Sequence, residues 1–258
     1  MSAKARVHET ARSRSGRRAT QFEPLDLTFR MIVIILNVNA LHHRAQRPQG
    51  ETSPMNGTYD PRSTAILLVD PYNDFTSEGG KLWPRLQEVA EDVGLVDNLR
   101  AIVKAARNAA AQVVFVPHHR WEETSYQGWR FVNASQAAAR DMRLFARGEW
   151  GGQFHPDLQP TDGDVVAGEH WGQNGFANTD LDLQLKQHGI SHVVVIGFIA
   201  NTCVEATARY AMELGYHVTL VRDATSAFGD EYMRAAHDLN GPTYAHAITT
   251  TKELLQNL

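Results

Sequence analysis

Six short runs of β-branched and apolar residues, separated by segments with helical periodicity, constrain the fold of this chain more than any other feature. Most of the runs are continuously apolar, which is typical of strands that helices cover on both faces. The runs span residues 64–69, 112–117, 164–167, 192–197, 217–221 and 245–250. The helical segments between and after them span residues 95–111, 179–188, 203–214, 230–239 and 251–258.

The alternation of strands and helices predicts right-handed crossovers and a mostly parallel sheet. Gly189 and Gly215 each follow a helical segment, where a residue in the left-handed conformation commonly ends a helix. We therefore expect an α/β fold, a three-layer Rossmann-like domain.

The first 58 residues differ from the rest of the chain. They hold 9 Lys and Arg against 4 Asp and Glu, whereas residues 59–258 hold 16 against 25. Polar stretches with scattered Gly and Pro predict that residues 1–58 form a disordered basic extension and that residues 59–258 form the folded domain. Residues 31–41 resemble the core of a secretory signal, but no clear cleavage site follows them. Met55 is an alternative start of translation.

Composition excludes several classes of protein. The net charge of −4 and the acidic domain argue against nucleic-acid binding. The longest apolar run, residues 31–38, is far shorter than the roughly 20 residues that span a bilayer. The single cysteine excludes a disulfide framework and a Cys-rich zinc site. We therefore expect a cytoplasmic protein that binds neither nucleic acid nor membrane.

Residues with catalytic chemistry follow the expected strands. Asp70 follows the first strand, His118 the second, His170 the third and Cys203 the fourth. Because ligands of open parallel sheets bind beyond the carboxyl ends of the strands, these side chains are expected at one edge. This convergence predicts an active site.

Cys203 lies at the start of a helical segment. Unpaired N–H groups and the helix dipole stabilise a thiolate there, which would make the cysteine a good nucleophile with a low pKa. The alternative is a small apolar residue that packs under the edge of the sheet.

Two stretches, residues 66–75 and 197–207, resemble the first-strand and nucleophile motifs of the isochorismatase-like cysteine hydrolases, and residues 215–225 match the strand that follows. The resemblance covers residues 62–252. This family includes nicotinamidases, carbamoyl hydrolases, isochorismatases and streptothricin hydrolase. The resemblance implies a six-stranded parallel sheet, a homodimer or homotetramer, and an Asp–Lys–Cys triad that needs no organic cofactor.

Carried over residue by residue, the resemblance makes Asp70 the catalytic acid and base and Cys203 the nucleophile. It also implies a cis peptide between Phe198 and Ile199, so that the backbone N–H groups of Ile199 and Cys203 form an oxyanion hole. We expect four side chains near the strand ends to contact the substrate: Tyr72, Phe75, Trp171 and Phe176.

The third member of the triad departs from the family pattern, since residues 165–176 contain no lysine. Counting back from Phe176 places His170 where the lysine is expected, and a longer loop would place Gly168 there. An imidazolium at His170 would favour the thiolate. Alternatively, His170 and Trp171 only line the pocket and the role is vacant, in which case Glu169 is the next residue to consider.

Metal and nucleotide sites are not expected. Arg120 stands where nicotinamidase-like members carry a second metal ligand, and the neighbouring His118 and His119 would point to opposite sides of a strand end. The glycines of residues 172–175 lack the spacing of a phosphate-binding loop. Three aromatic residues after the second strand would form a lid or an oligomer contact: Trp121, Trp129 and Phe131.

These observations favour a cysteine-dependent hydrolase of a C–N amide in a small molecule, acting through a thioester. A cyclic amide such as a lactam in an antibiotic of the streptothricin type is one candidate substrate. The alternatives are an isochorismatase-type vinyl-ether hydrolase and a non-catalytic binding protein that keeps the pocket.

Overall fold

The structure, a computed structural model, describes residues 59–258, and the expectations for the N-terminal extension lie outside this range. Its centre is a six-stranded sheet in the order β3-β2-β1-β4-β5-β6, in which every neighbouring pair of strands is parallel. The strands are β1 (Thr64–Val69), β2 (Gln112–Val116), β3 (Val165–Val166), β4 (His192–Phe198), β5 (His217–Ser226) and β6 (Ala247–Thr249). The expected fold class is confirmed.

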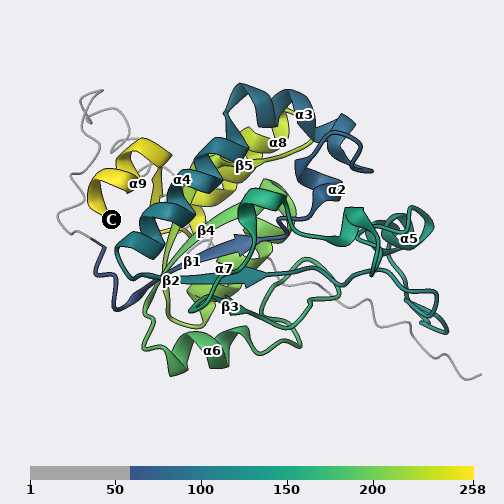
Figure 1. Cartoon of the computed structure of the whole chain (residues 1–258), viewed down its shortest axis with the longest axis horizontal. Helices are drawn as coiled ribbons and strands as arrows, with labels where there is room; N and C mark the ends of the chain where they lie inside the picture. The colour runs from purple at the N-terminus through teal and green to yellow at the C-terminus, as the bar shows by residue number, and fades with distance from the viewer. Residues whose placement is uncertain (1–58) are drawn as a thin grey trace, which may run out of the picture. The chain divides into compact units, whose positions relative to one another are not determined.

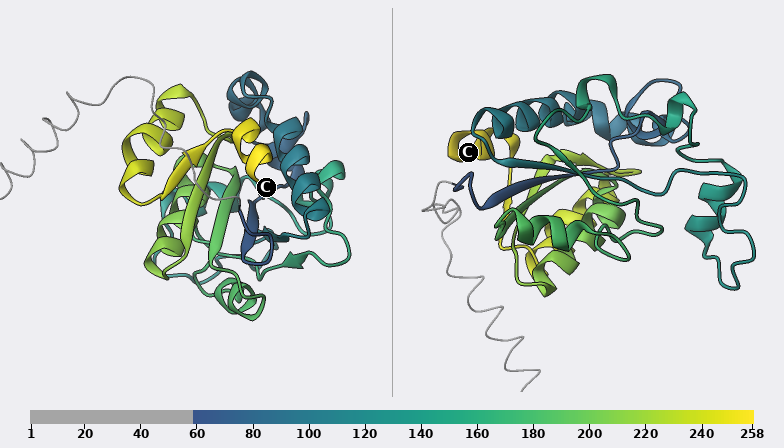
Figure 2. Two further views of the ribbon diagram at one scale, coloured as in Figure 1. Left: turned by 90° about the vertical axis from the view of Figure 1, so that its left-hand side faces the viewer. Right: turned by 60° about the horizontal axis from the view of Figure 1, so that its bottom comes forward.

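Helices cover both faces of the sheet and make the three expected layers (Figures 1 and 2). One face is covered by α3 (Trp83–Asp92), α4 (Leu95–Asn108) and α9 (Thr251–Asn257). The other face is covered by α6 (Leu181–Gln187) and α7 (Glu205–Glu213). Three further helices, α2 (Asn73–Thr76), α5 (Ala134–Asp141) and α8 (Asp230–Arg234), complete the α-helical elements of the described residues.

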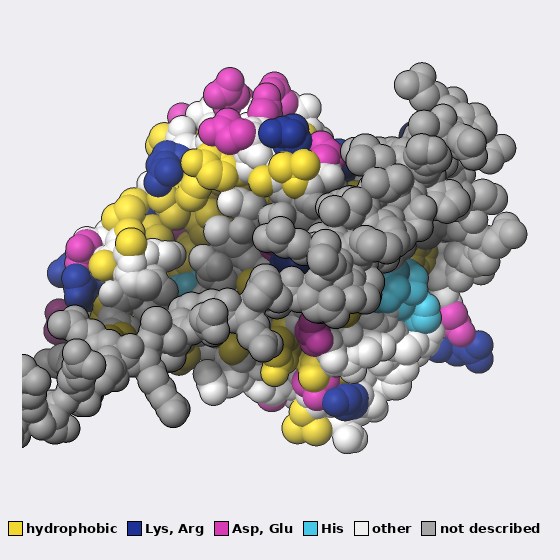
Figure 3. Space-filling view, turned by 180° about the vertical axis from the view of Figure 1, so that it is seen from behind, with side chains coloured by type: hydrophobic (Ala, Val, Ile, Leu, Met, Phe, Trp, Pro, Cys, Tyr) yellow, Lys and Arg dark blue, Asp and Glu magenta, His cyan; other side chains and the backbone are white. Residues whose placement is uncertain are grey.

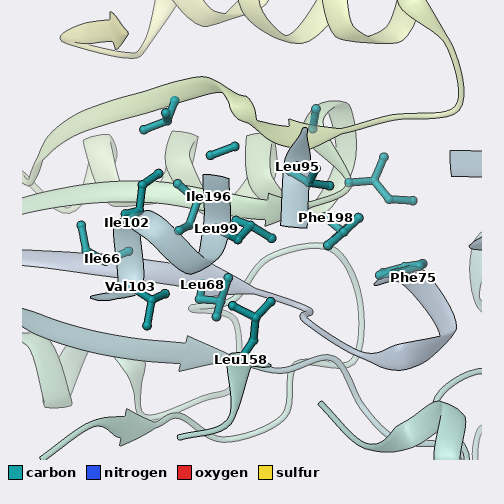
Figure 4. Close-up of a cluster of buried hydrophobic side chains, with 14 of the residues drawn as sticks. Ile66, Leu68, Phe75, Leu95, Leu99, Ile102, Val103, Leu158, Ile196 and Phe198 are labelled. Carbon is teal, nitrogen blue, oxygen red and sulfur yellow. The ribbon is translucent and has the colours of Figure 1, made fainter. Parts of the chain in front are cut away.

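The core shows why continuous apolar runs became central strands. Successive side chains of β1 point to opposite faces, so that Ile66 and Leu68 join the core on the α4 side while Leu67 joins the other core. Figure 4 shows Ile66 and Leu68 near Leu99 of α4 and Ile196 of β4. Each is fully buried, and burying such a side chain contributes about 1.5–3 kcal/mol.

Gly197 allows β4 to approach β1 closely near the carboxyl ends of both strands. Its φ is +112°, and a Cβ atom there would lie 2.2 Å from the carbonyl oxygen of Val69. Any other residue would therefore force the two strands apart just before their active-site ends.

The structure adds helices that the sequence did not predict, namely α2, α3 and α5. Helix α5 buries none of its side chains, so the apolar periodicity that identifies a helix is missing, although Asn133 and Gln136 form a capping box at its start. The helix expected at 203–214 begins with a π-helical turn, Ala200–Val204, before α7. Figure 1 shows α2 and α5 beyond the carboxyl ends of β1 and β2.

The surface carries charges of both signs. On the face shown in Figure 3, acidic, basic and hydrophobic side chains lie interspersed where described residues are visible, and histidine side chains reach the surface. Within residues 59–258, the helices are too short or too polar to cross a membrane.

Candidate active site

The candidate site lies where the strand order of the sheet reverses. The chain passes from β1 outward to β2 and β3 and then returns to place β4 on the other side of β1. The crossovers on the two sides of this switch point diverge and leave a crevice at the carboxyl ends of the strands. Asp70 directly follows β1, and Cys203 lies in the turn that follows β4.

Asp70 is fully buried, with a φ of +54°. Its backbone N–H donates to the carbonyl oxygen of Val116, which fixes the turn after β1 (3.1 Å). Its carboxylate atom Oδ1 lies 3.1 Å from Nε2 of His170. Its other oxygen, Oδ2, is buried and makes no hydrogen bond to a nitrogen or oxygen atom of the described residues, whereas the carboxylate does form a hydrogen bond with the Cys203 thiol. The carboxylate is therefore placed to accept the proton of this thiol.

His170 is also fully buried. Its Nδ1 lies 2.9 Å from the carbonyl oxygen of Gly172, which can only accept, so Nδ1 carries a hydrogen. Burial alone would lower the pKa of His170. The charge of Asp70, the hydrogen bonds to Asp70 and Gly172 and the charge of Glu169 outweigh burial, and the pKa is raised. The raised pKa favours an imidazolium that donates from Nε2 to Asp70.

Cys203 completes the cluster. One ligand atom from each of Asp70, His170 and Cys203 lies within 4.8 Å of the other two, and all three residues are buried. Burial, the negative charge of Asp70 and the hydrogen bond to the Asp70 carboxylate raise the pKa of the Cys203 thiol well above its usual range, although hydrogen bonds from the Thr202 side chain and the Ile199 backbone act in the opposite direction. The expectation of a low-pKa cysteine was therefore wrong: burial and a neighbouring carboxylate outweigh the helix terminus.

A cavity of about 390 Å³ opens onto this cluster. Asp70, Ile199 and Cys203 line it, and the peptide bond between Phe198 and Ile199 is cis, as the family resemblance implied. His170 lies behind Asp70 and does not line the cavity. The volume suits a small molecule.

Of the four side chains expected to contact substrate, the structure places Phe75 in the cavity lining and the other three elsewhere. Tyr72 stacks on Phe145, with ring centroids 4.6 Å apart, and donates its hydroxyl hydrogen to the carbonyl oxygen of His118. Trp171 stacks on the His119 ring at 3.6 Å, and Phe176 packs in the core below the sheet. Tyr72 touches the lining through Phe145, whereas Trp171 and Phe176 are held by contacts outside it, and the contact of these three side chains with substrate stays a prediction.

Sequence reasoning missed much of the cavity wall, which comes from segments without strands. The missed lining residues of α5 and its flanks are Asn133, Ala134, Ser135, Gln136, Ala138, Ala139, Met142, Leu144 and Phe145. Others come from elsewhere: Leu82, Arg85, Gly172, Gln173, Thr202 and Phe228. Buried Asp74 holds part of this wall in place, since its carboxylate accepts from the backbone N–H of Phe145 (2.7 Å). Asp74 lies in the motif after β1, which is a signal that could have pointed to it.

Glu169, the alternative third residue, is held by two arginines. It accepts from the backbone N–H and the guanidinium of Arg120 and from the guanidinium of Arg147. Burial would raise its pKa, but its hydrogen bonds to His119 and Arg120 and the charge of Arg120 lower it to about 2. This carboxylate is therefore ionised and fully engaged, whereas His170 contacts Asp70 directly.

His118 and His119 point to different surroundings. His118 lines the cavity, and burial lowers its pKa to about 4, so its ring is neutral near pH 7. His119 lies beside Trp171, and its Nε2 is 2.8 Å from the hydroxyl of Ser125. Within residues 59–258, the group spaced to hold a metal ion is Asp70, His170 and Cys203 rather than these two histidines.

The aromatic residues after β2 lie apart from the cavity lining. Trp129 is 43% exposed and Phe131 is 80% exposed. The guanidinium carbon of Arg143 lies over the ring of Trp121, 4.6 Å from the ring centroid. Helix α5, rather than these three residues, flanks the cavity.

Comparison with known proteins agrees with this architecture. The isochorismatase domain family matches residues 64–252. A cysteine hydrolase from Pseudomonas syringae pv. phaseolicola superposes with a TM-score of 0.65 at 26% identity, covering 78% of this chain and 94% of that one. An isochorismatase-like hydrolase from Alkaliphilus metalliredigens gives a TM-score of 0.60 at 26% identity, and the match covers 75% of this chain and 98% of that one.

A curated relative is similar in sequence. The ureidoacrylate amidohydrolase RutB of Serratia proteamaculans is 31% identical over 217 residues, which cover 78% of this chain and 87% of the relative. The fold, the switch-point site and these matches define a hydrolase of the isochorismatase-like class. The chain belongs to the isochorismatase family, as its motifs suggested.

Proposed function

We propose that this protein is a cysteine-dependent amidohydrolase that cleaves a C–N amide bond of a small molecule through a thioester. One observation carries the proposal: Asp70 and Cys203, the single cysteine of the chain, line the same cavity, and the Asp70 carboxylate is hydrogen-bonded to the Cys203 thiol. A carboxylate placed to accept the thiol proton is the base that a cysteine nucleophile needs.

The raised pKa of Cys203 determines when the proton moves. At neutral pH the thiol keeps its proton, so the nucleophile forms only when the amide carbonyl is within reach. Asp70 takes the thiol proton as the sulfur–carbon bond forms. The carbonyl oxygen becomes an oxyanion, which the backbone N–H groups of Ile199 and Cys203 would stabilise.

Collapse of this intermediate breaks the C–N bond. Asp70 returns the proton to the departing nitrogen, which leaves as ammonia or an amine. Water, deprotonated by Asp70, then attacks the thioester carbonyl. The acid product leaves, and Cys203 recovers its proton from Asp70. His170 keeps the Asp70 carboxylate oriented through the contact of its Nε2 with Oδ1.

The kind of amide is the finer part of the proposal. The name of the relative RutB supports ureido compounds as substrates. In a ureido group the carbonyl carbon is bonded to a nitrogen atom on each side, and one of these two C–N bonds is cleaved. A lactam of the streptothricin type is the second candidate, and it rests on the family resemblance alone. The cavity of about 390 Å³ favours the smaller, open-chain ureido compounds.

The test uses purified protein and a panel of ureido acids, primary amides and lactams, with released ammonia or amine as the readout. Cys203→Ala should lower turnover by at least 1,000-fold, in line with the loss of a nucleophile that other groups cannot replace. The melting temperature should stay within a few degrees of wild type, because the change removes a single atom from a small side chain.

Two further measurements sharpen this test. Acid quenching during turnover should trap an acyl group on Cys203, detectable by mass spectrometry, and dialysis against a chelator should leave activity unchanged. Turnover of Cys203→Ala within tenfold of wild type would contradict the thioester mechanism. Activity lost to the chelator and restored by zinc would instead assign Asp70, His170 and Cys203 to a metal ion.

A further inference from the structure

The cavity lining carries one cation, Arg85, whose charge no acidic side chain of residues 59–258 pairs with. Asp70, Arg85 and His118 are the acidic and basic side chains in its lining. Asp70 is paired with His170, and His118 is neutral near pH 7. Arg85, an exposed residue of α3, makes neither an ion pair nor a side-chain hydrogen bond within residues 59–258.

The position of Arg85 is nevertheless defined. Its guanidinium carbon lies 4.0 Å from the ring centroid of Phe228, and Phe228 also lines the cavity. This cation–π contact holds the guanidinium at the cavity wall without using its N–H groups as hydrogen-bond donors to side-chain or backbone oxygen atoms.

We infer that Arg85 binds a carboxylate of the substrate while the amide of that substrate lies at Cys203. A guanidinium edge matches a carboxylate with two parallel N–H···O bonds, and such charge-assisted bonds are among the strongest that a pocket offers. Neutral polar side chains that also line the cavity, such as Gln136 and Gln173, suit the polar body of a ureido compound. This inference rests on the proposed amidohydrolase function and narrows its substrates to anionic amides.

The test compares two ligands that differ only at the proposed carboxylate: 3-ureidopropionate and the uncharged 3-ureidopropan-1-ol. Calorimetry on the Cys203→Ala protein measures binding without turnover. We expect the carboxylate to bind at least tenfold more tightly than the alcohol, since a hydrogen-bonded charge pair contributes about that factor or more. Adding Arg85→Gln should remove most of this difference, and adding Arg85→Lys should keep part of it.

A matched control is available in Arg130, whose guanidinium lies 5.1 Å from the ring centroid of Phe131 and which is outside the cavity lining. Arg130→Gln should keep the full preference for the carboxylate. A general loss of structure in Arg85→Gln would weaken both ligands equally, whereas loss of a carboxylate contact weakens only one. Equal affinities for the two ligands before mutation, or an unchanged preference in Arg85→Gln, would overturn the inference, as would failure of both ligands to bind.

Turnover by the unmodified protein separates this inference from the proposed function. Hydrolysis of both ligands without preference for the acid would support the amidohydrolase and refute the role of Arg85. Preferential binding of the acid through Arg85, with no hydrolysis of any amide in the panel, would support the anion site and refute the amidohydrolase.

Discussion

The two halves of the site are built differently. Asp70 and Cys203 follow β1 and β4, adjacent strands that pair over six positions from Thr64 to Val69. His170 follows β3, which has two residues and pairs with β2 at two positions. The first half carries the two residues that the family resemblance implied, and in the second half His170 lies beside Asp70, where we expected the lysine of that resemblance.

This difference has a physical reason. Long, fully buried strands fix the register of the residues that follow them, because a shift by one residue would turn apolar side chains out of the core. The end of a two-residue edge strand is positioned mainly by local contacts instead. For His170 these are Asp70 and Gly172, together with a backbone N–H bond to the carbonyl oxygen of Pro117 (3.0 Å). Such a position tolerates a different cation more readily than Asp70 or Cys203 tolerates replacement.

The largest effect that would test this comparison is expected at His170. His170→Gln keeps the approximate shape of the ring but removes the positive charge beside Asp70. We expect kcat to fall about 100-fold, because losing a charge-assisted bond to a buried carboxylate costs about 2–3 kcal/mol. His170→Lys should restore a substantial part of kcat, since it supplies the charge again.

The pH profile distinguishes this role from simple packing. Wild-type kcat should fall on the alkaline side as His170 loses its proton, above the usual range for histidine because its pKa is raised. In His170→Lys this fall should move to higher pH. Profiles that coincide for the two proteins from pH 5 to 9 would remove the His170 charge from the mechanism.

A smaller effect is expected on stability. The raised pKa of His170 means that the folded state holds this proton more tightly than the unfolded chain, whose histidine pKa is about 6.5. Below the pKa of the unfolded chain, the pair of His170 with Asp70 therefore contributes its full stabilisation to the fold. This contribution is lost as the pH rises through the higher pKa of the folded state.

Urea unfolding of wild type and His170→Gln between pH 6 and 9 measures this contribution. The difference in unfolding free energy should be largest at pH 6, about 3 kcal/mol for a broken buried pair, and should shrink toward pH 9. A difference that grows with pH would mean that His170 is neutral in the folded protein.

The smallest effect on catalysis is expected at Glu169, which lies beside His170 in the sequence but is held by Arg120 and Arg147. Glu169→Gln should lower the unfolding free energy by about 1–2 kcal/mol at pH 7, because it weakens partly buried ion pairs. We expect kcat/KM to change less than fivefold, measured on the best substrate of the panel. A fall in kcat comparable to that of His170→Gln would place Glu169 in the mechanism and break the contrast between neighbouring residues.

The sequence predicted the strands better than the walls of the cavity. Its first predicted strand, 64–69, coincides with β1, because uninterrupted apolar residues leave few other arrangements in a two-sided core. The same reasoning overestimated β3, where Val166 is 48% exposed on the edge of the sheet. Helix α5 buries no side chain, so no apolar pattern marked it, yet it supplies much of the cavity lining.

For the site, the sequence alone determined that Asp70, His170 and Cys203 would meet, since each follows a strand and parallel strands end at one edge of the sheet. Only the tertiary structure decided how they behave together. The pKa of the Cys203 thiol is raised rather than lowered, because burial and the charge of Asp70 act through space between residues far apart in the chain. The place of Arg85 in the cavity lining, without an ion pair to any acidic side chain of residues 59–258, is likewise a tertiary property, since it depends on which side chains the folded chain brings together.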